Sequence, residues 1–273
     1  MRALLGLLAL AFAAASLAPL PLRARSPAAK PASASNDDEL RLGAQLFAQL
    51  KEQGEIVATS PLYLTLQPIA TRITKAIQSQ YPYPIHFYIV HEKQPNAFAA
   101  PGGNVYVVDS LFYFVKNTEE LAGTLCHETS HLLHHDSVTL MKQNRAITQR
   151  AIAATILLGP TITTALTVAA IGRLDSLHRS RAVEEKADLK GSDTCAAAGY
   201  DPWGLVWLFQ DFSSAQLKTP PEILSDHPND AHRIRALEQH FRDDPGTFAQ
   251  FSSDPATATH LALPANEAEH FLR

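Results

Sequence analysis

The sequence predicts an α+β fold that is mainly helical, with a small β-sheet packed beside one central helix. Two β-rich segments, residues 84–92 and 105–108, lie close together in the chain, and most of the chain after Asp109 has the apolar spacing of helices. The first long helix after the strands carries the motif HETSH, so His127 and His131 lie one turn apart on the same helical face. These observations predict a pair of histidines beside the sheet.

The composition is that of an ordinary globular protein. The chain has 273 residues, enough for one sizeable domain or two small ones, with 46% hydrophobic and 18% charged residues. The formal net charge is -4, and the sequence has no local basic cluster. Since nucleic-acid binding usually requires a basic face, the composition argues against a nucleic-acid partner.

The first residues are typical of a secretory signal peptide. A short basic start, Met1–Arg2, precedes the apolar run Ala3–Ala18, which is too short to favour a membrane span, and prolines follow. Residues 1–34 are therefore predicted to be a signal peptide and a Pro/Ala-rich linker, with an uncleaved N-terminal anchor as the alternative. We expect export of the chain, a main domain over residues 35–245 and a short tail over residues 246–273.

The elements before the motif are marked by apolar spacing and by turn residues. Apolar side chains at helical intervals predict a first helix from Asp37, and Ser60–Pro61 supplies the N-cap and first proline of a second helix. The two β-rich segments come next, and Pro101–Gly103 is predicted to form a turn between extended pieces.

Charge, glycine and proline mark the later helices. Thr118, followed by two glutamates that suit the helix dipole, begins the motif helix, which is expected to run to about His135. Three further helices are predicted: residues 179–198, ended by Gly199; one that starts at Pro202; and one from Pro228 to about Phe241.

One long uncharged segment, residues 151–171, is a candidate transmembrane helix by its length alone. A single crossing, however, would put the two histidines and Glu184 on opposite sides of the membrane, where they could not bind one metal ion. We therefore expect a buried or surface-dipping helical hairpin bent at Gly159–Pro160, which leaves a peripheral membrane contact through this segment open.

The motif HETSH has the chemistry of a zinc site. Imidazoles at positions i and i+4 of a helix can reach one ion, and zinc binds imidazole nitrogen well, so His127 and His131 are predicted ligands. Zinc lowers the pKa of a water molecule in an open position, and Glu128 could accept its proton and deliver it to the leaving amine. The apolar flanks predict a buried helix, in which these polar groups need the compensation of a metal ion.

A second helix supplies the third predicted ligand. Glu184 and Asp188 are again spaced i and i+4, in the stretch RAVEEKAD. Glu184 is predicted to bind the metal, while Asp188 accepts the outer N–H of a ligand histidine and fixes its tautomer. Glu185 competes for the role of ligand, but no carboxylate lies four residues after it.

Four ordered motifs resemble one peptidase family. They are HETSH with the later E-x-x-x-D pair, NAFAAPGGNVYVVDSLF, EELAGTLCHETSHLLHHDS and SDHPNDAHRIRAL. They are similar to the HExxH gluzincin family that contains HtpX-like, Oma1-like and CAAX prenyl protease-type peptidases. The resemblance spans about Asp37 to Phe241. Exported bacterial members of the BepA and LoiP type resemble the chain best, because it lacks the several membrane helices of HtpX.

This resemblance implies a zincin-type metallopeptidase domain with one Zn2+ per chain. It also implies that Asn96, Ala97, Phe98 and Ala99 belong to an edge strand beside the active-site cleft; the alternative is that they simply end a small sheet. An exposed edge binds a peptide through its backbone, so unfolded or misfolded polypeptide is the expected substrate. The exported bacterial members imply a periplasmic location.

Two residues of SDHPNDAHRIRAL are further catalytic candidates. His227 could be a fourth zinc ligand, a donor to the tetrahedral oxyanion or a helix-capping residue. Arg233 could also face the oxyanion, or it could hold the C-terminal helix by an ion pair.

The expected function is zinc-dependent hydrolysis of peptide bonds in unfolded or misfolded envelope proteins, as part of protein quality control. The alternative is a chaperone-like binding protein whose zinc site is closed by a fourth ligand. Cys126 and Cys195 lie on the two predicted site helices and could form a disulfide in an oxidising compartment or remain buried thiols. The sequence leaves both states open, as it does the oligomeric state.

Overall fold

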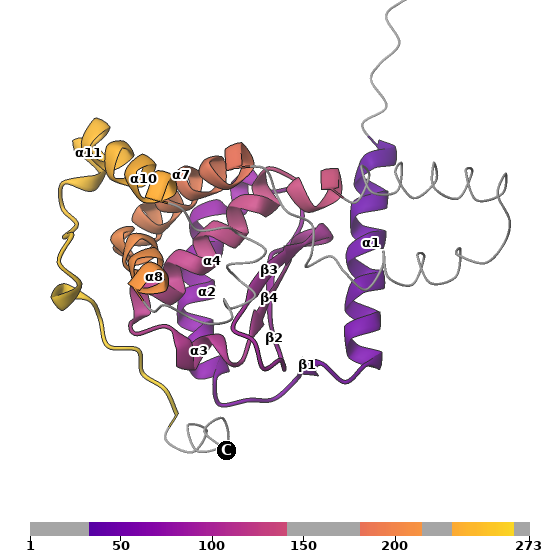
Figure 1. Ribbon diagram of the computed structural model, residues 1–273. Helices are drawn as coiled ribbons and strands as arrows, with labels where there is room; N and C mark the ends of the chain where they lie inside the picture. The colour runs from indigo at the N-terminus through magenta and orange to yellow at the C-terminus, as the bar shows by residue number, and fades with distance from the viewer. Residues whose placement is uncertain (1–32, 141–180, 215–230, 265–273) are drawn as a thin grey trace, which may run out of the picture.

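The computed structural model describes residues 33–140, 181–214 and 231–264 (Figure 1). The predicted signal peptide, the uncharged segment 151–171 and His227 therefore lie outside the described residues, apart from the last two residues of the 1–34 segment. Within the described ranges, helices surround a small sheet, which confirms the mainly helical α+β class. None of the helices in these ranges is both long and apolar enough to cross a membrane.

The sheet has four strands in the order β1-β2-β4-β3. They are β1 (Ile56–Val57), β2 (His86–Val90), β3 (Ala97–Ala100) and β4 (Asn104–Val108). β2 and β4 are parallel, whereas β1 and β3 pair antiparallel with their neighbours. The predicted β-rich segments correspond to β2 and β4, and the extended stretch that includes Ala97, Phe98 and Ala99 forms β3 at one edge of the sheet.

The turn between β3 and β4 requires glycine. Pro101–Gly103 forms the short 3-10 helix η2, in which Gly102 and Gly103 have φ values of 77° and 90°. L side chains rarely adopt such values, and a Cβ at Gly103 would also collide with the carbonyl oxygen of Pro84. The turn therefore allows β3 to fold back tightly onto β4.

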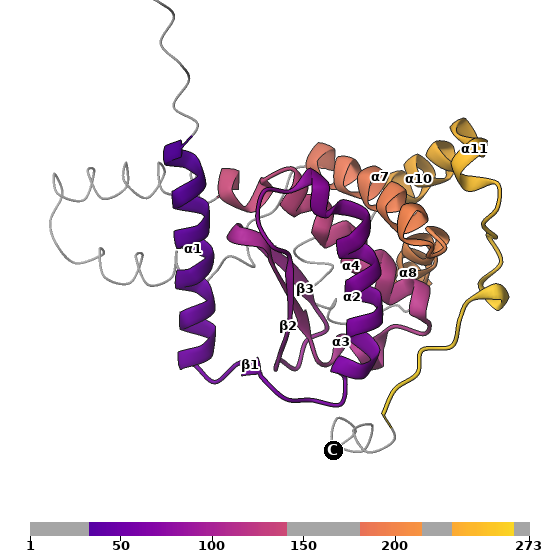
Figure 2. The same cartoon turned by 180° about the vertical axis from the view of Figure 1, so that it is seen from behind.

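One face of the sheet is covered by the main layer of helices (Figures 1 and 2). These helices are α2 (Tyr63–Ile77), α4 (Thr118–Leu133), α7 (Arg181–Ala198), α8 (Trp203–Ser214) and α10 (Ala231–Asp243). In α2 the buried residues Leu66, Ile69, Ala70, Ile73 and Ile77 form a stripe at helical spacing. Ser60–Pro61, predicted to be the N-cap and the first residue of this helix, instead belongs to a turn just before it, and the helix begins at Tyr63.

The other face of the sheet carries α1 (Ser33–Glu52), which lies apart from the other helices in both views (Figures 1 and 2). Leu50 and Phe47 of α1 belong to a second apolar cluster with Tyr88, Phe98 and Tyr106 of the sheet. The sheet is therefore enclosed between a thick layer of helices and a single long helix.

Residues 136–140 are also helical, and the described chain has four further short elements with defined bounds. They are η1 (Gln78–Gln80), α3 (Leu111–Phe114), α11 (Pro245–Phe248) and η3 (Pro255–Thr257). After α11 the chain returns to the start of α4, where the Thr118 N–H donates to the Thr259 carbonyl and the Thr259 N–H donates to Glu119. The C-terminal segment up to residue 264 thus contacts the helix that carries the candidate site.

Candidate metal centre

Helix α4 is the central element of the site and is buried on every side. Asn117 is its N-cap and accepts a hydrogen bond from the Glu120 N–H. Glu119 and Glu120 lie in the first turn, where their negative charges interact favourably with the positive end of the helix dipole. Each residue from Glu119 to Leu132 is buried. His127 and His131 are therefore largely shielded from solvent, and their polar atoms need partners among protein groups or a bound ion.

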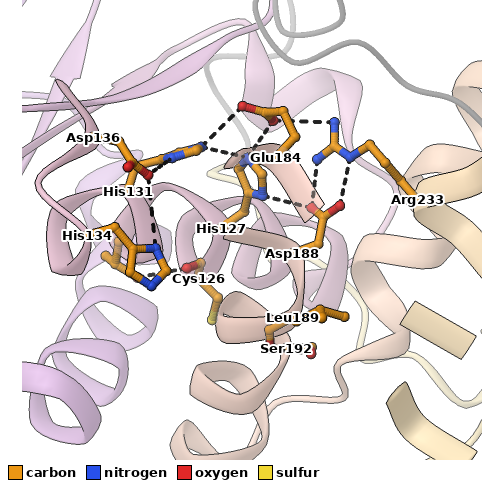
Figure 3. A network of polar contacts seen from close by, with 11 residues as sticks. Cys126, His127, His131, His134, Asp136, Glu184, Asp188, Leu189, Ser192 and Arg233 are labelled. Carbon is orange, nitrogen blue, oxygen red and sulfur yellow. Dashed lines mark hydrogen bonds and ion pairs between the residues drawn. The ribbon is translucent and has the colours of Figure 1, made fainter. Parts of the chain in front are cut away.

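The side chains of His127, His131 and Glu184 converge on one point (Figure 3). The Nε2 atoms of the two histidines are 3.1 Å apart. The Glu184 Oε2 atom is 3.3 Å from the Nε2 of His127, and its Oε1 atom is 3.6 Å from the Nε2 of His131. The exposed fractions of the three residues are 4%, 0% and 1%, so this convergence lies inside the protein.

Close packing between α4 and α7 brings Glu184 to the histidines. Gly191 of α7 lies against the backbone of His127, where an added Cβ would be only 3.0 Å from the His127 Cα. Near this contact the structure joins Cys126 to Cys195 in a disulfide, with Cα atoms 5.8 Å apart. Of the two states that the sequence left open, the structure therefore contains the disulfide.

Each histidine has a carboxylate at its outer ring nitrogen. Asp188 Oδ1 is 2.9 Å from the Nδ1 of His127, as expected from the sequence, and Asp136 Oδ2 is 2.9 Å from the Nδ1 of His131. Such pairs fix the tautomer of a metal-binding imidazole and turn its other nitrogen toward the ion. Sequence analysis missed Asp136, although a carboxylate five residues after His131, just beyond the helix end, was a weak signal.

The competing residue Glu185 points elsewhere. Its carboxylate lies 3.5 Å from His232 in a partly exposed ion pair, whereas Glu184 is fully buried between the two histidines. An oxygen of Glu128 also lies within 4.8 Å of a nitrogen of each histidine. The Glu184 oxygens lie 3.3 and 3.6 Å from the two Nε2 atoms, whereas Glu128 accepts a hydrogen bond from the strand β3, so the geometry favours Glu184 as the third ligand.

Glu128 instead contacts the edge strand. Its side chain is fully buried, and its Oε2 accepts a hydrogen bond of 2.9 Å from the Ala99 N–H of β3. Asn96, also buried, caps this strand, since its side-chain oxygen accepts from the Ala97 N–H at 2.8 Å. The predicted strand residues and the predicted proton acceptor therefore meet on one side of the histidine pair.

Arg233 lies behind the ligands, on α10. Its guanidinium donates to both oxygens of Asp188, at 2.7 and 2.6 Å, and stacks on the Phe209 ring at 4.4 Å. It is also 3.5 Å from Glu184. Burial alone would raise the pKa of Asp188, but Arg233 and His127 outweigh this effect and hold that pKa below its usual value. Of the two roles expected for Arg233, the ion pair is the one visible in this arrangement.

The donor set fits a divalent cation such as zinc. Because each Nδ1 faces a carboxylate, both Nε2 atoms point toward the same space beside Glu184, an arrangement that suits a bound cation. Burial lowers the pKa of His127, yet Asp188 and Glu184 more than offset this effect and raise it to about 9. Ligands about 2.0 to 2.1 Å from a tetrahedral zinc ion lie roughly 3.3 Å from one another. The three distances here, 3.1, 3.3 and 3.6 Å, agree with that spacing.

Comparison with known proteins gives the family. The model of peptidase family M48 matches residues 64–240, which include the whole convergence of His127, His131 and Glu184. The chain belongs to peptidase family M48. Membership confirms the resemblance that the four sequence motifs predicted.

Three similar proteins are 27–28% identical to this chain over the aligned residues. A beta-barrel assembly-enhancing protease of Yersinia pestis is 28% identical over 207 residues, covering 72% of this chain and 42% of the relative. The mitochondrial metalloendopeptidase OMA1 of Schizosaccharomyces pombe is 27% identical over 210 residues, covering 75% and 61%. The metalloprotease YcaL of Escherichia coli (strain K12) is 27% identical over 218 residues, covering 78% and 82%. The chain thus spans less than half the length of the Yersinia relative.

The M48 match also extends over residues that the structure does not describe. His227 lies within it, between α8 and α10, and its three expected roles remain predictions. The segment 151–171 likewise lies within the match and between the two helices that carry the ligands.

Proposed function

We propose that this chain is a zinc-dependent endopeptidase. The observation that carries the proposal is the convergence of His127, His131 and Glu184 in a buried M48 site, with Glu128 one residue from a ligand and beside an edge strand. Two neutral imidazoles and one carboxylate are a ligand set found in catalytic zinc sites, which keep a further position for water or substrate.

Each side chain has a distinct task in this proposal. His127, His131 and Glu184 would hold the zinc ion, which when bound polarises the scissile carbonyl and lowers the pKa of water. Glu128 accepts the proton of the attacking water and returns it to the leaving amine. Asp188 and Asp136 hold the imidazoles in the tautomer that turns Nε2 inward.

In this proposal Arg233 does not contact the substrate but holds the carboxylates of the metal site in place. Its bonds to Asp188 and its closeness to Glu184 support a role in fixing both carboxylates. The separate expectation that His227 or Arg233 donates to the oxyanion is retained only for His227, because the Arg233 guanidinium is committed to Asp188. We infer that His227 supplies that donor or a fourth ligand.

The proposed substrate is an extended polypeptide that pairs with β3. Asn96, Ala97, Phe98 and Ala99 form or cap a strand at the sheet edge nearest Glu128, and strand addition would place a peptide beside the proton acceptor. Because backbone pairing depends on an extended conformation more than on sequence, unfolded or misfolded chains are the substrate class we propose.

The proposed setting is protein quality control in a bacterial envelope, after export to the periplasm. The apolar N-terminal segment supports export, and the name of the Yersinia relative refers to β-barrel assembly. A disulfide beside the metal site is also more stable in an oxidising compartment than in the cytosol.

The decisive test compares the chain, expressed from about Ser35, with its Glu128→Gln variant. Glutamine keeps the shape of Glu128 and can still accept from the Ala99 N–H, but it cannot take up a proton. We expect one zinc ion per chain in both proteins, by elemental analysis, and cleavage of casein by the parent alone. The turnover of the variant should fall by about 100-fold or more.

Other outcomes separate the alternatives. Cleavage that persists in the variant would remove Glu128 from the reaction. One zinc ion in both proteins without cleavage in either would favour the chaperone-like binding protein with a closed site, and His227→Ala would then be examined for restored turnover. A lack of stoichiometric zinc in both, after reconstitution, would refute the metal site itself.

A further inference from the structure

Strand β3 has one edge paired with β4 and one edge that faces the candidate site. In the antiparallel register Phe98 lies opposite Tyr106, and the Asn96 carbonyl accepts from the Val108 N–H. Successive residues of such a strand direct their backbone groups to opposite edges, so the N–H and C=O of Ala99 point away from β4. This outward edge is the one to which an additional strand could pair.

Both outward groups of Ala99 are occupied by side chains of the same protein. The N–H donates to Glu128 at 2.9 Å, and the carbonyl accepts from the Ser137 hydroxyl at 2.7 Å. The second contact is a short, direct hydrogen bond, and Ser137 is only 8% exposed. Ser137 therefore sits where a peptide N–H would have to approach the edge strand.

Ser137 reaches β3 from the end of the metal helix. Helix α4 ends at Leu133, residues 134 and 135 form a turn, and a helical segment begins at residue 136. We call residues 134–137 the α4 turn. His135, within it, has a φ of 54°, a left-handed conformation that is rare for residues other than glycine. This reversal carries Ser137 back beside the edge strand that α4 contacts through Glu128.

The α4 turn is fixed from two sides. Glu39 of α1, itself buried, lies 2.8 Å from the Nδ1 of His135 and accepts a hydrogen bond from the Tyr81 hydroxyl. Asp136, the next residue of the turn, lies 2.9 Å from the Nδ1 of His131. The turn that positions Ser137 thus also carries Asp136, the carboxylate beside the predicted ligand His131.

We propose that Ser137 competes with the substrate for the Ala99 carbonyl and so weakens the binding of extended peptides. This inference rests on the proposed function, because it assumes that a polypeptide adds to the outward edge of β3. In antiparallel addition the peptide donates to the Ala99 carbonyl and accepts from the Ala99 N–H. The first bond displaces the Ser137 hydroxyl, and the second releases Glu128 from Ala99. A peptide that binds must therefore replace two internal contacts.

The direct test measures the affinity for a fluorescent casein peptide, by anisotropy, in the Glu128→Gln background that prevents turnover. Adding Ser137→Ala leaves the Ala99 carbonyl without its internal donor, and one hydrogen bond of this kind changes an equilibrium by about two- to tenfold. We expect the dissociation constant to fall by that factor. Ser192→Ala is the matched control, since Ser192 is also buried and its hydroxyl donates within α7 to the Leu189 carbonyl; it should leave the affinity unchanged.

Kinetics separate this role from a catalytic or purely structural one. With Glu128 intact, Ser137→Ala should lower KM by the same factor with kcat retained. An unchanged or weaker peptide affinity, or a fall in kcat with a raised KM, would overturn the proposal. If the parent binds the peptide without cleaving it and Ser137→Ala still tightens binding, the proposed hydrolysis fails while the competition stands.

A second pair of variants covers the case in which Ser137→Ala does not fold. Ser137→Thr and Ser137→Val have the same shape and differ only in the hydroxyl group. We expect the threonine variant to bind the casein peptide more weakly than the valine variant by about two- to tenfold. Equal affinities of the two variants would contradict the competition.

Discussion

At the residue scale, Asp188 and Asp136 each contact the Nδ1 atom of one metal-site histidine, but their surroundings differ. Asp188 is almost completely buried, and Arg233 donates to both of its oxygens. Asp136 belongs to the α4 turn, where its side chain is 19% exposed. Because Asp136 is partly exposed, its replacement tests the orientation of His131 with little disturbance of the core.

We predict that Asp136→Asn weakens zinc binding by about 10- to 100-fold, the usual loss when a partner of a ligand histidine is removed. Asparagine keeps the size of the side chain but loses the charge that makes the imidazole more basic. Zinc affinity is measured by competition with a chromophoric chelator. The control is Asp193→Asn, which alters a similar pair, 2.8 Å from His240, outside the site. Equal affinity in both variants would show that Asp136 does not support His131.

The sequence predicts the ligands at this scale better than their surroundings. His127 and His131 are separated by one helical turn, so local geometry alone brings them together. Ser137 and Asp136 depend on the left-handed conformation of His135 and on its contact with Glu39, 96 residues away in the sequence. No periodic pattern encodes a contact of that kind, and sequence analysis assigned no role to Asp136 or Ser137.

At the element scale, the site depends on the packing of α4 against α7. The two helices meet at Gly191, and the disulfide between Cys126 and Cys195 joins them covalently beside the first ligand. His127 directly succeeds Cys126, and Asp188 precedes Cys195 by two helical turns. The disulfide therefore limits how far the two halves of the site can separate.

We predict that replacing both cysteines, Cys126→Ser with Cys195→Ser, lowers the free energy of unfolding of the zinc-free protein by about 2 to 4 kcal/mol. The cause is the greater freedom of an unfolded chain that lacks this cross-link. Urea denaturation of the chelated protein measures the change, and adding a reductant to the parent should reproduce it. A parent whose urea midpoint does not respond to the reductant would refute the contribution of the bond.

Element prediction succeeded where a pattern was long enough. The alternation in residues 84–92 predicted β2, whereas β1 has only two residues, Ile56–Val57, and pairs at the sheet edge. Two residues are too few to show a periodic pattern. This strand forms through its pairing with β2, which the sequence of β1 alone does not reveal. The motif helix ends at Leu133, two residues before the predicted end near His135. The difference arises because the reversal after the helix depends on tertiary contacts.

At the scale of the whole molecule, the segment around residues 253–261 packs against the start of α4 and against α8. Thr259 bonds to both Thr118 and Glu119 at the start of α4, and the Trp207 indole donates to the Ser253 carbonyl. Leu261 of the same segment is 5% exposed and belongs to the main core. A segment with few apolar residues could not be assigned to the core from its sequence, because its burial depends on surfaces formed by distant helices.

We predict that Leu261→Ala lowers the free energy of unfolding by about 2 to 4 kcal/mol, as expected for a buried leucine that leaves a cavity. Leu64→Ala is the matched control, because Leu64 is 77% exposed and its loss should change stability by about 0.5 kcal/mol or less. Thermal and urea denaturation measure both variants. Similar small effects would mean that the C-terminal segment contributes little to the fold.

The disulfide has a further consequence for the integrity of the molecule. His127, His131, Glu184 and Asp188 all lie between Cys126 and Cys195, which are 69 residues apart in the sequence. A single cut of the backbone between the two site helices would therefore leave the chain in one covalent piece, with a histidine pair on one fragment and its carboxylates on the other. A nicked molecule could keep its metal site assembled until the environment becomes reducing.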